Sequence, residues 1–347
     1  MIEPETASAT VYRYTLPLSD GTAAGEAGSR REGALLELLD EHGNVGWGEA
    51  APLPGFSREG VDEAARQLAV FSSGEAVEEP YPSVRFALEL GHLSLRAAAS
   101  GETLARLLSS VPRGRVGLNA LISSGPDEAP AEARQLRQAG YRAVKLKVGR
   151  RPVDEEARLV RRVADELEGV SLRLDANRAW SLAEALEFAR GIRGVEIEYV
   201  EEPLADAALL PEFAYESGLP VALDESLVGL PAAGLTGHDY ASAVVLKPTL
   251  LGGISRSMAL AARADDLGMK AVVSSAFESG VGTLGLVALA AALPGGGEPA
   301  GLDTYRRLDA DVLRPVLGLE SALDVPALLG EEREIDSLYL EPVEREP

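Results

Sequence analysis

Cysteine is absent from this 347-residue chain, which excludes disulfide bonds, thiolate metal ligands and cysteine nucleophiles. Long apolar runs are also lacking, because no stretch approaches the ~20 uncharged apolar residues that a membrane-spanning helix needs. The opening segment MIEPETASAT has no basic region followed by an apolar one, so we expect no secretory signal. Together these absences favour a cytoplasmic enzyme.

Positive charge is scarce as well. The formal net charge is −22, and such a surface repels nucleic acid and anionic membranes, so we expect neither as a partner. Acidic residues are abundant, and arginine greatly outnumbers lysine. Two explanations remain open for this composition, namely a salt-rich cytoplasm and a codon bias. With 46% apolar and 25% charged residues, the composition is that of a globular protein.

Lysine is the rarest charged residue. Only four of the 33 basic residues are lysines, and Lys145 and Lys147 both lie in the apolar run 142–148. In a β-strand the two lysines share one face, while Val144 and Leu146 share the other. Because a buried ammonium group is unfavourable unless it is paired, this strand predicts carboxylates close by.

The N-terminal part of the chain has a mixed pattern. Segment 34–56 is typical of two strands joined by a turn and followed by a Pro/Gly-rich loop. Segments 58–72 and 83–108 have helical periodicity. We therefore expect an α+β domain over residues 1–110.

From residue 116 onward, predicted strands alternate with predicted helices. One helix begins at a capping box formed by Ser181 and Glu184, and two others end at Gly140 and Gly268. Eight strand candidates follow one another, at 116–121, 142–148, 171–176, 198–203, 220–225, 243–248, 270–275 and 301–305. This alternation predicts a closed parallel barrel with helices outside. An open doubly wound sheet is the alternative, and the absence of G-x-G-x-x-G after any strand disfavours it.

Charged residues end five consecutive strands of this pattern: Lys147, Asp175, Glu201 with Glu202, Asp224 with Glu225, and Lys247. A single acidic residue after a strand is commonly a helix cap or a solvated loop residue. Five such positions in consecutive strand–helix units instead indicate one site, at the barrel end where active sites form.

The chemistry of this set favours a hard metal ion. Three carboxylates from adjacent strands suit Mg²⁺, whereas zinc is disfavoured without cysteine and with His42, His92 and His238 all away from these strand ends. Lysines on both sides of the metal are candidates for proton transfer. Arginine cannot replace them, because it does not give up its proton.

The chain resembles the muconate-lactonizing subgroup of the enolase superfamily in KLK (145–147), LRLDANRAW (172–180), VEEP (200–203), LDES (223–226) and VLKPTLLGG (245–253). The resemblance covers almost the whole chain. It implies an α/β protein with a (β/α)7β modified TIM barrel at residues 111–314. An N-terminal α+β capping domain at 1–110, joined by the C-terminal segment 315–347, is expected to cover the barrel mouth.

The resemblance implies that Asp175, Glu201 and Asp224 bind Mg²⁺, for which Mn²⁺ can substitute. We take the first glutamate of EEP as the ligand, because subgroup members with EQP have only that one. Glu202 is then expected to support the ligands or to cap the core.

The same resemblance implies roles for the lysines. Lys147 is expected to be the acid–base residue, Lys145 the neighbour that lowers its pKa, and Lys247 the opposite lysine.

Four further residues, Arg173, Asn177, Ser274 and Ser275, are expected to bind substrate, and segment 52–57 is expected to form a lid.

Within the subgroup, GWGEAAPLPGFSRE (46–59), SSAFES (274–279) and GLDT (301–304) resemble the o-succinylbenzoate synthases of menaquinone biosynthesis. These enzymes carry out an Mg²⁺-dependent syn-dehydration of 2-succinyl-6-hydroxy-2,4-cyclohexadiene-1-carboxylate, so we expect a small carboxylate substrate. Histidine-dependent chemistry of the mandelate racemase type is disfavoured, because no histidine lies near the sixth or seventh strand. Two alternatives remain: an N-succinylamino acid racemase or dipeptide epimerase with the same two lysines, and a non-catalytic carboxylate- or Mg²⁺-binding module.

Overall fold

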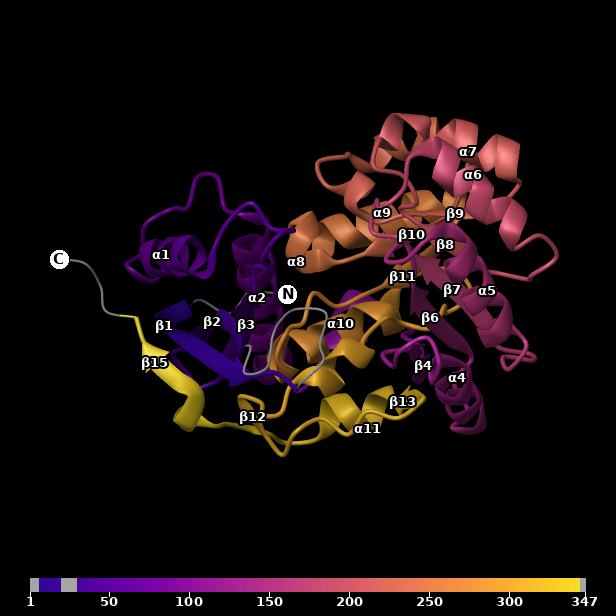
Figure 1. Ribbon diagram of the computed structural model, residues 1–347. Helices are drawn as coiled ribbons and strands as arrows, with labels where there is room; N and C mark the ends of the chain where they lie inside the picture. The colour runs from indigo at the N-terminus through magenta and orange to yellow at the C-terminus, as the bar shows by residue number, and fades with distance from the viewer. Residues whose placement is uncertain (1–5, 20–29, 344–347) are drawn as a thin grey trace.

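Seven parallel strands form the larger sheet of the molecule, and helices surround it (Figure 1). The structure, a computed structural model, describes residues 6–19 and 30–343. Residues 1–5 and 20–29 of the expected capping domain and 344–347 of the expected C-terminal segment lie outside this description, as does part of the segment in which we expect no secretory signal.

The strands of the large sheet lie side by side in chain order. They are β5 (Asn119–Leu121), β6 (Ala143–Lys147), β7 (Ser171–Asp175), β8 (Tyr199–Glu201), β9 (Val221–Leu223), β10 (Ala241–Leu246) and β11 (Lys270–Val273). The helices between and after them are α4 (Ala129–Gln138), α5 (Val153–Ala164), α6 (Leu182–Gly191), α7 (Leu210–Ser217), α8 (Pro248–Leu251), α9 (Ile254–Asp266) and α10 (Gly280–Ala292). This alternation confirms the predicted fold class and contradicts the open doubly wound sheet.

A short eighth segment closes the barrel. Parallel bridges join Ala300 to Leu118 beside β5, and Gly301 to Ser274 after β11. The expected strand at 301–305 is therefore reduced to these two bridging residues, because the chain turns into a 3-10 helix at Asp303–Arg307.

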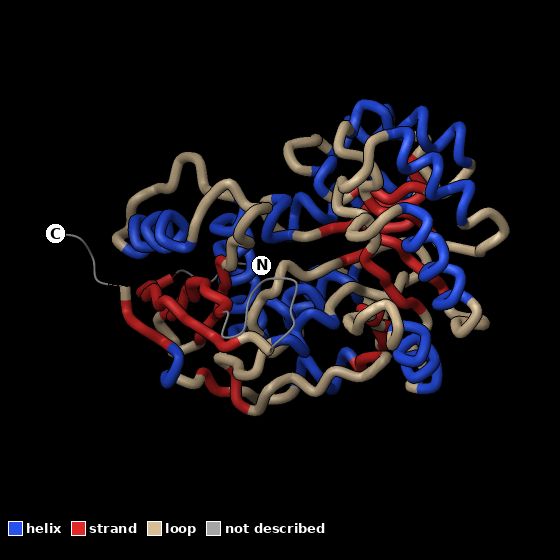
Figure 2. The backbone as a smooth tube through the Cα atoms, in the orientation of Figure 1, coloured by secondary structure: helices blue, strands red, loops and turns tan. Residues whose placement is uncertain are grey.

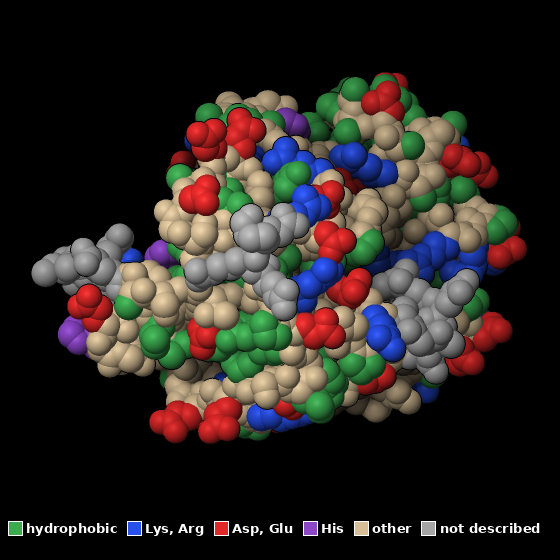
Figure 3. All heavy atoms as spheres, turned by 90° about the vertical axis from the view of Figure 1, so that its left-hand side faces the viewer, with side chains coloured by type: hydrophobic (Ala, Val, Ile, Leu, Met, Phe, Trp, Pro, Cys, Tyr) green, Lys and Arg blue, Asp and Glu red, His purple; other side chains and the backbone are tan. Residues whose placement is uncertain are grey.

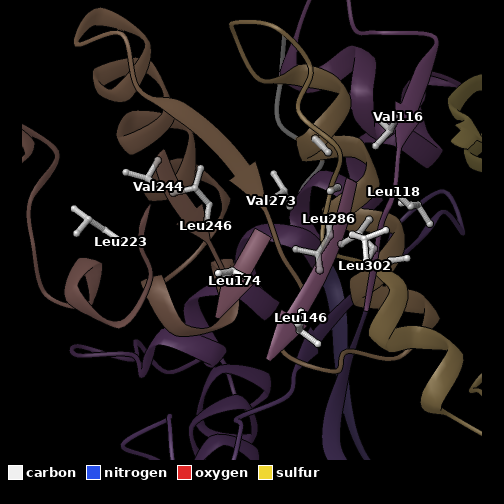
Figure 4. Close-up of a cluster of buried hydrophobic side chains, with 14 of the residues drawn as sticks. Val116, Leu118, Leu146, Leu174, Leu223, Val244, Leu246, Val273, Leu286 and Leu302 are labelled. Atoms are coloured by element: carbon white, nitrogen blue, oxygen red, sulfur yellow. The ribbon is translucent and has the colours of Figure 1, made fainter. Parts of the chain in front are cut away.

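The side chains of the barrel strands alternate between two environments. Leu146, Leu174, Leu223 and Leu246 are at most 4% exposed and belong to the hydrophobic core shared with the outer helices (Figure 4). Each buried leucine stabilises the fold by ~1.5–3 kcal/mol. The alternate positions point into the barrel, where Tyr199, Ala222, Ala243, Val245 and Val272 form a small separate core. The same alternation directs the strand-end charges inward.

Local capping fixes several helix ends as the sequence predicts. The Ser181 side chain caps α6, and Glu184 completes the capping box by accepting from the Ser181 backbone at 2.9 Å. Gly140 and Gly268 follow α4 and α9 with φ of 85° and 73°, which glycine adopts without strain.

A second, antiparallel sheet lies apart from the barrel (Figure 2). Its strands are β1 (Thr6–Pro17), β2 (Arg30–Asp40), β3 (Val45–Ala50) and β15 (Leu340–Pro342), in the order β15-β1-β2-β3. It packs with α1 (Val61–Ser72) and α2 (Pro82–Ser100), and α3 (Leu104–Leu108) follows. The helix expected at 83–108 is divided because Gly101 adopts φ of 70°.

The C-terminal part of the chain runs from the barrel back to this sheet (Figure 1). Its elements are β12 (Leu313–Arg314), β13 (Ala322–Asp324), α11 (Val325–Gly330), β14 (Glu334–Ile335) and β15, and β13 pairs with β4 (Arg115–Gly117). Through β15 the end of the chain pairs with β1, as the expected association of segment 315–347 requires; the domain limits themselves stay a prediction.

Two buried charges of the antiparallel sheet contact the loop and helix that follow β11. Arg31 on β2 is 4% exposed and donates hydrogen bonds to the carbonyls of Ala51, Pro52, Ala276 and Phe277 at 2.5–3.0 Å. This guanidinium group therefore ties the base of the expected lid segment to the barrel loop that carries the two site serines.

Glu49 on β3 makes the complementary contact. Its carboxylate is fully buried and accepts from the backbone N–H groups of Ser279 and Gly282 at the start of α10, at 2.8 and 2.7 Å. An acidic group at a helix N-terminus is stabilised by the unpaired N–H groups there. The barrel loop is thus held from both ends.

We expect Arg31→Lys to lower the free energy of unfolding by about 1–3 kcal/mol, because an ammonium group cannot reproduce the planar guanidinium fork that donates to five carbonyls, including that of Glu32. Denaturant unfolding of the purified variant measures the change. Its neighbour Arg30 is exposed, so Arg30→Lys is the matched control and should unfold like the original chain. Equal stability of the two variants would show that the Arg31 contacts contribute nothing.

Candidate active site

A cavity of about 360 Å³ opens at the carboxyl ends of the barrel strands. Its lining includes Leu53, Pro54 and Phe56 from the loop after β3 and seven of the predicted site residues: Lys145, Lys147, Asp175, Asn177, Lys247, Ser274 and Ser275. These seven residues and the expected lid segment therefore meet at one cavity, whereas Glu201 and Asp224 do not line it.

Three lysines and three carboxylates form a buried ion-pair cluster beside this cavity. Lys145 Nζ lies 2.8 Å from both Glu201 oxygens and 2.9 Å from Asp175 Oδ2. Lys147 Nζ lies 3.2 Å from the same Asp175 oxygen, and Lys247 forms an ion pair with Asp224. Each lysine in the cluster is thus paired with at least one carboxylate, as a buried ammonium group requires.

The charges in the cluster shift one another's pKa values. Burial opposes ionisation of Lys145, but the Asp175 and Glu201 carboxylates outweigh it and hold the pKa of Lys145 well above the usual value. Burial and the Asp175 charge raise the pKa of Glu201 to about 7. At Asp175 the neighbouring lysines overcome burial and lower the pKa. Lys145 is therefore held as a cation between two acids.

Glu201 and Glu202, although adjacent, have different surroundings. Glu201 faces Lys145 inside the barrel, whereas Glu202 accepts hydrogen bonds from the backbone of Asp224 and Ser226 and from the Arg178 side chain, at 2.7–3.1 Å. Glu202 also has φ of 40°, a left-handed conformation that is uncommon outside glycine. These contacts fix the loops after β8 and β9, which is the supporting position expected for Glu202.

Of the four polar residues expected to bind substrate, Asn177, Ser274 and Ser275 line the cavity and Arg173 does not. Asn177 accepts a hydrogen bond from Lys147 Nζ at 2.5 Å. Ser275 shares a hydrogen bond of 2.7 Å with Thr304, and Ser274 donates to the carbonyl of Gly301 at 3.3 Å. The seventh strand end and the eighth segment are therefore joined by side-chain hydrogen bonds at the mouth.

Arg173 lies elsewhere. It is on the same inward face of β7 as Asp175 but two residues earlier, about 6.6 Å deeper along the strand. Its guanidinium group donates to Glu198 at 2.7 Å and to the Pro299 carbonyl at 2.8 Å, and it stacks over the Tyr199 ring. The expectation that Arg173 flanks metal and substrate is therefore corrected: it does not line the cavity and fills the barrel interior below it.

The loop after β3 covers the cavity from the antiparallel sheet. Phe56 is 43% exposed, and its ring centroid lies 5.8 Å from Lys247 Nζ, in the range of a cation–π contact. The loop therefore reaches Lys247, and Arg31 anchors its base.

Several cavity residues were not among the predicted ones, namely Asn119, Arg150, Arg151, Asp303, Thr304 and Arg307. Asn119 belongs to β5, the arginine pair follows β6, and the other three lie in the 3-10 helix after the eighth segment. All of these except Asn119, which begins β5, lie just after a barrel segment, the same signal that identified the acids and lysines.

The carboxylates of Asp175, Glu201 and Asp224 are the candidate ligands for a metal ion. Among the described residues no three acidic or histidine side chains converge as a ready-made cluster, because the Lys145 ammonium group lies between Asp175 and Glu201. The three acids nevertheless offer only oxygen, and the neighbouring Glu225 keeps one buried carboxylate oxygen without a hydrogen-bond partner. Buried, acid-rich and oxygen-only, these residues fit a hard divalent cation.

The fold and the site together define the class of protein. A family model described as enolase C-terminal domain-like matches residues 128–330, so the chain belongs to the enolase superfamily. Solved structures agree on the fold: a dipeptide epimerase from Cytophaga hutchinsonii has a TM-score of 0.84 at 19% identity, over 97% of this chain and 99% of that one. A muconate lactonizing enzyme from Pseudomonas fluorescens has a TM-score of 0.83 at 21% identity, over 98% and 100%.

Within that superfamily the chain belongs to the o-succinylbenzoate synthase family, and it is a carbon–oxygen lyase. The o-succinylbenzoate synthase of Edwardsiella ictaluri is 34% identical over 332 residues, which cover 91% of this chain and 98% of that protein. The synthase of Haemophilus influenzae is 33% identical over 335 residues, covering 90% and 97%. A second family model, MenC, N-terminal domain, matches residues 6–95.

We expect Arg173→Met to lower the free energy of unfolding by about 1–3 kcal/mol, because it removes the hydrogen bonds to Glu198 and to the Pro299 carbonyl while Lys270 still pairs with Glu198. The KM for substrate should change by less than about twofold, since Arg173 does not reach the cavity. Chemical denaturation and steady-state kinetics measure the two effects.

Arg134→Met is the control, because Arg134 makes an exposed ion pair with Glu166 and should contribute little stability. A large rise in KM for Arg173→Met without loss of stability would return Arg173 to the substrate site.

Proposed function

We propose that Lys147 and Lys247 carry out the syn-dehydration of 2-succinyl-6-hydroxy-2,4-cyclohexadiene-1-carboxylate to o-succinylbenzoate. The observation that carries this assignment is the order of the strands. Lys147 ends β6 and Lys247 follows β10, which are four positions apart in a barrel of seven strands and one closing segment. Both lysines line one cavity from opposite walls, and the strands of the three acids lie between them.

Lys147 is the proposed base and acid. Its side chain is 24% exposed, against 14% for Lys145 and 11% for Lys247, so it has the freest access to the cavity. As a neutral amine it removes the proton from the carbon that bears the ring carboxylate. The resulting ammonium group then protonates the departing hydroxyl, water leaves, and the ring becomes aromatic.

Lys247 is the proposed electrostatic partner. The Asp224 and Glu201 carboxylates outweigh its burial and raise its pKa, so it faces the substrate as a cation. A fixed positive charge opposite the base stabilises the ene-diolate that forms when the proton is removed. Lys145 remains paired with Asp175 and Glu201 and keeps both acids in position.

We assign Asp175, Glu201 and Asp224 to a divalent cation, which we take to be Mg²⁺ with Mn²⁺ able to substitute. The bound cation would stabilise negative charge on the substrate carboxylate. The donor chemistry supports this assignment, as does the Mg in the related dipeptide epimerase structures. Where the ion binds, the Lys145 ammonium group must give up part of its contact with the two acids.

The setting we propose is the cytoplasm, with a small carboxylate substrate and with neither nucleic acid nor membrane as partner. Across the described residues, no helix combines the length and the apolar character that crossing a bilayer demands.

Replacing either opposed lysine should abolish most of the turnover. We expect Lys147→Ala to lower kcat by about 10²–10⁴-fold, the usual contribution of an acid–base residue. Lys247→Ala should lower kcat by more than about tenfold, because it should cost more than ~1.4 kcal/mol of transition-state stabilisation. Steady-state dehydration assays measure both.

Lys270→Ala is the matched control, because Lys270 is the remaining lysine and pairs with Glu198 at the other end of the barrel. It should keep the original kcat. Full dehydration activity of Lys247→Ala would refute the role of Lys247 as a cation.

Removal of divalent metal with EDTA should stop dehydration, and added Mg²⁺ or Mn²⁺ should restore it. Binding should also raise the melting temperature of the folded protein, because a ligand at about 100 times its Kd adds ~2.7 kcal/mol to stability. Thermal unfolding with and without Mg²⁺ measures this independently of turnover. Asp224→Asn should lose the stabilisation by metal, and unchanged activity in EDTA would exclude a metal role.

A further inference from the structure

Three arginines line the cavity, although the chain as a whole carries a net charge of −22. Arg150 and Arg151 follow β6, and Arg307 lies in the 3-10 helix after the closing segment. Acidic side chains are spread over the face shown in Figure 3, with basic ones nearer its middle. A local excess of positive charge at the cavity therefore needs an explanation.

The arginines differ in whether a protein acid already neutralises them. Arg151 lies 3.8 Å from the buried Glu156 carboxylate. Within residues 6–19 and 30–343, by contrast, the Arg150 and Arg307 side chains have no hydrogen-bond or ion-pair partner. Two acids line the cavity: Asp175 is paired with Lys145 and Lys147, and Asp303 is paired with Arg306 at 2.7 Å and accepts from Tyr141 at 3.2 Å. Among the described residues, nothing therefore occupies these two guanidinium groups, and they can pair with a ligand.

The strand order places these two groups on a particular wall. Around the closed barrel, Asp175, Glu201 and Asp224 follow β7, β8 and β9, whereas the closing segment of Arg307 lies opposite β8. Arg150 and Arg307 follow the two barrel segments on either side of β5. Because β5 lies opposite β9 in the closed barrel, the cationic end of the cavity is centred across the mouth from Asp224, although Arg150 follows the strand next to that of Asp175.

A ligand that matches both ends carries two carboxylates. The proposed substrate, on whose assignment this inference depends, has one carboxylate on the ring and a second at the end of its succinyl chain. The geometry points to Arg150 and Arg307 as a second-carboxylate subsite that binds the succinyl terminus while the ring carboxylate lies at the acid end. Arginine suits this role, because its planar fork pairs with a carboxylate through two parallel hydrogen bonds.

This subsite determines specificity. A substrate with an uncharged chain would leave both guanidinium groups unpaired on binding, whereas a terminal carboxylate pairs with them. The chain should therefore discriminate between dicarboxylates and monocarboxylates of the same shape, without any change in the groups that move the proton.

The test compares two ligands that differ only at the chain end: o-succinylbenzoate, and 2-butyrylbenzoate, which lacks the terminal carboxylate. Calorimetric titration gives Kd for each, in the presence of Mg²⁺. We expect Arg150→Gln and Arg307→Gln each to weaken o-succinylbenzoate binding on the order of tenfold, and the double variant to weaken it further. Binding of 2-butyrylbenzoate should change by less than about twofold.

Arg142→Gln is the matched control, because Arg142 is an exposed arginine at the opposite end of β6 from the cavity. Arg307→Lys retains the charge without the fork and should give an intermediate loss. Equal weakening of both ligands, or no weakening of either, would overturn the subsite.

Dehydration assays on the same proteins separate the two proposals. If the original chain dehydrates the cyclohexadiene acid but the glutamine variants bind o-succinylbenzoate normally, only the subsite is wrong. If the original chain neither turns over the acid nor binds o-succinylbenzoate, the proposed function fails and the subsite fails with it.

Discussion

Three lysine side chains and three carboxylates share the carboxyl end of the barrel interior, and each is tolerated there because a partner of the other kind lies beside it. Lys145 between Asp175 and Glu201 is the centre of this arrangement. Isolated, any one of these buried ions would be strongly unfavourable. The pairing therefore allows the barrel to hold three amines and a metal-compatible set of acids beside one cavity. The lid contact of Phe56 and the anchor of Arg31 act on a site that this cluster has already organised.

The period-two alternation of the strands explains why so much of the site could be predicted from the sequence. Lys145 and Lys147 point inward because Val144 and Leu146 are needed outside, under the helices. The same rule orients Asp175, Glu201 and Asp224, whose positions at strand ends are visible in the sequence. The resemblance to a known family added roles that alternation alone cannot give, and these roles stay predictions.

What could not be predicted depends on contacts between distant segments. β1 was missed, and its pairing with β15 joins the two ends of the chain, which no local pattern reveals. The strand expected at 301–305 shrank because the chain must turn at Asp303 to bring Thr304 to Ser275. The resemblance to the family placed Arg173 at the mouth of the barrel. The alternation along β7 does direct its side chain inward, but Arg173 lies two residues before Asp175 and therefore below the cavity. Depth along a strand separates a residue that lines a site from one that supports it.

The account depends most on the opposition of two amines across one carbon atom. A crystal structure of the protein with o-succinylbenzoate and Mg²⁺ tests this directly. We predict that the ion lies among Asp175, Glu201 and Asp224, with the Nζ atoms of Lys147 and Lys247 on opposite faces of the ring carbon that bears the carboxylate. The account would be contradicted if both amines lay on the same face of the ring, or if the ion bound elsewhere while Lys145 remained between its two acids.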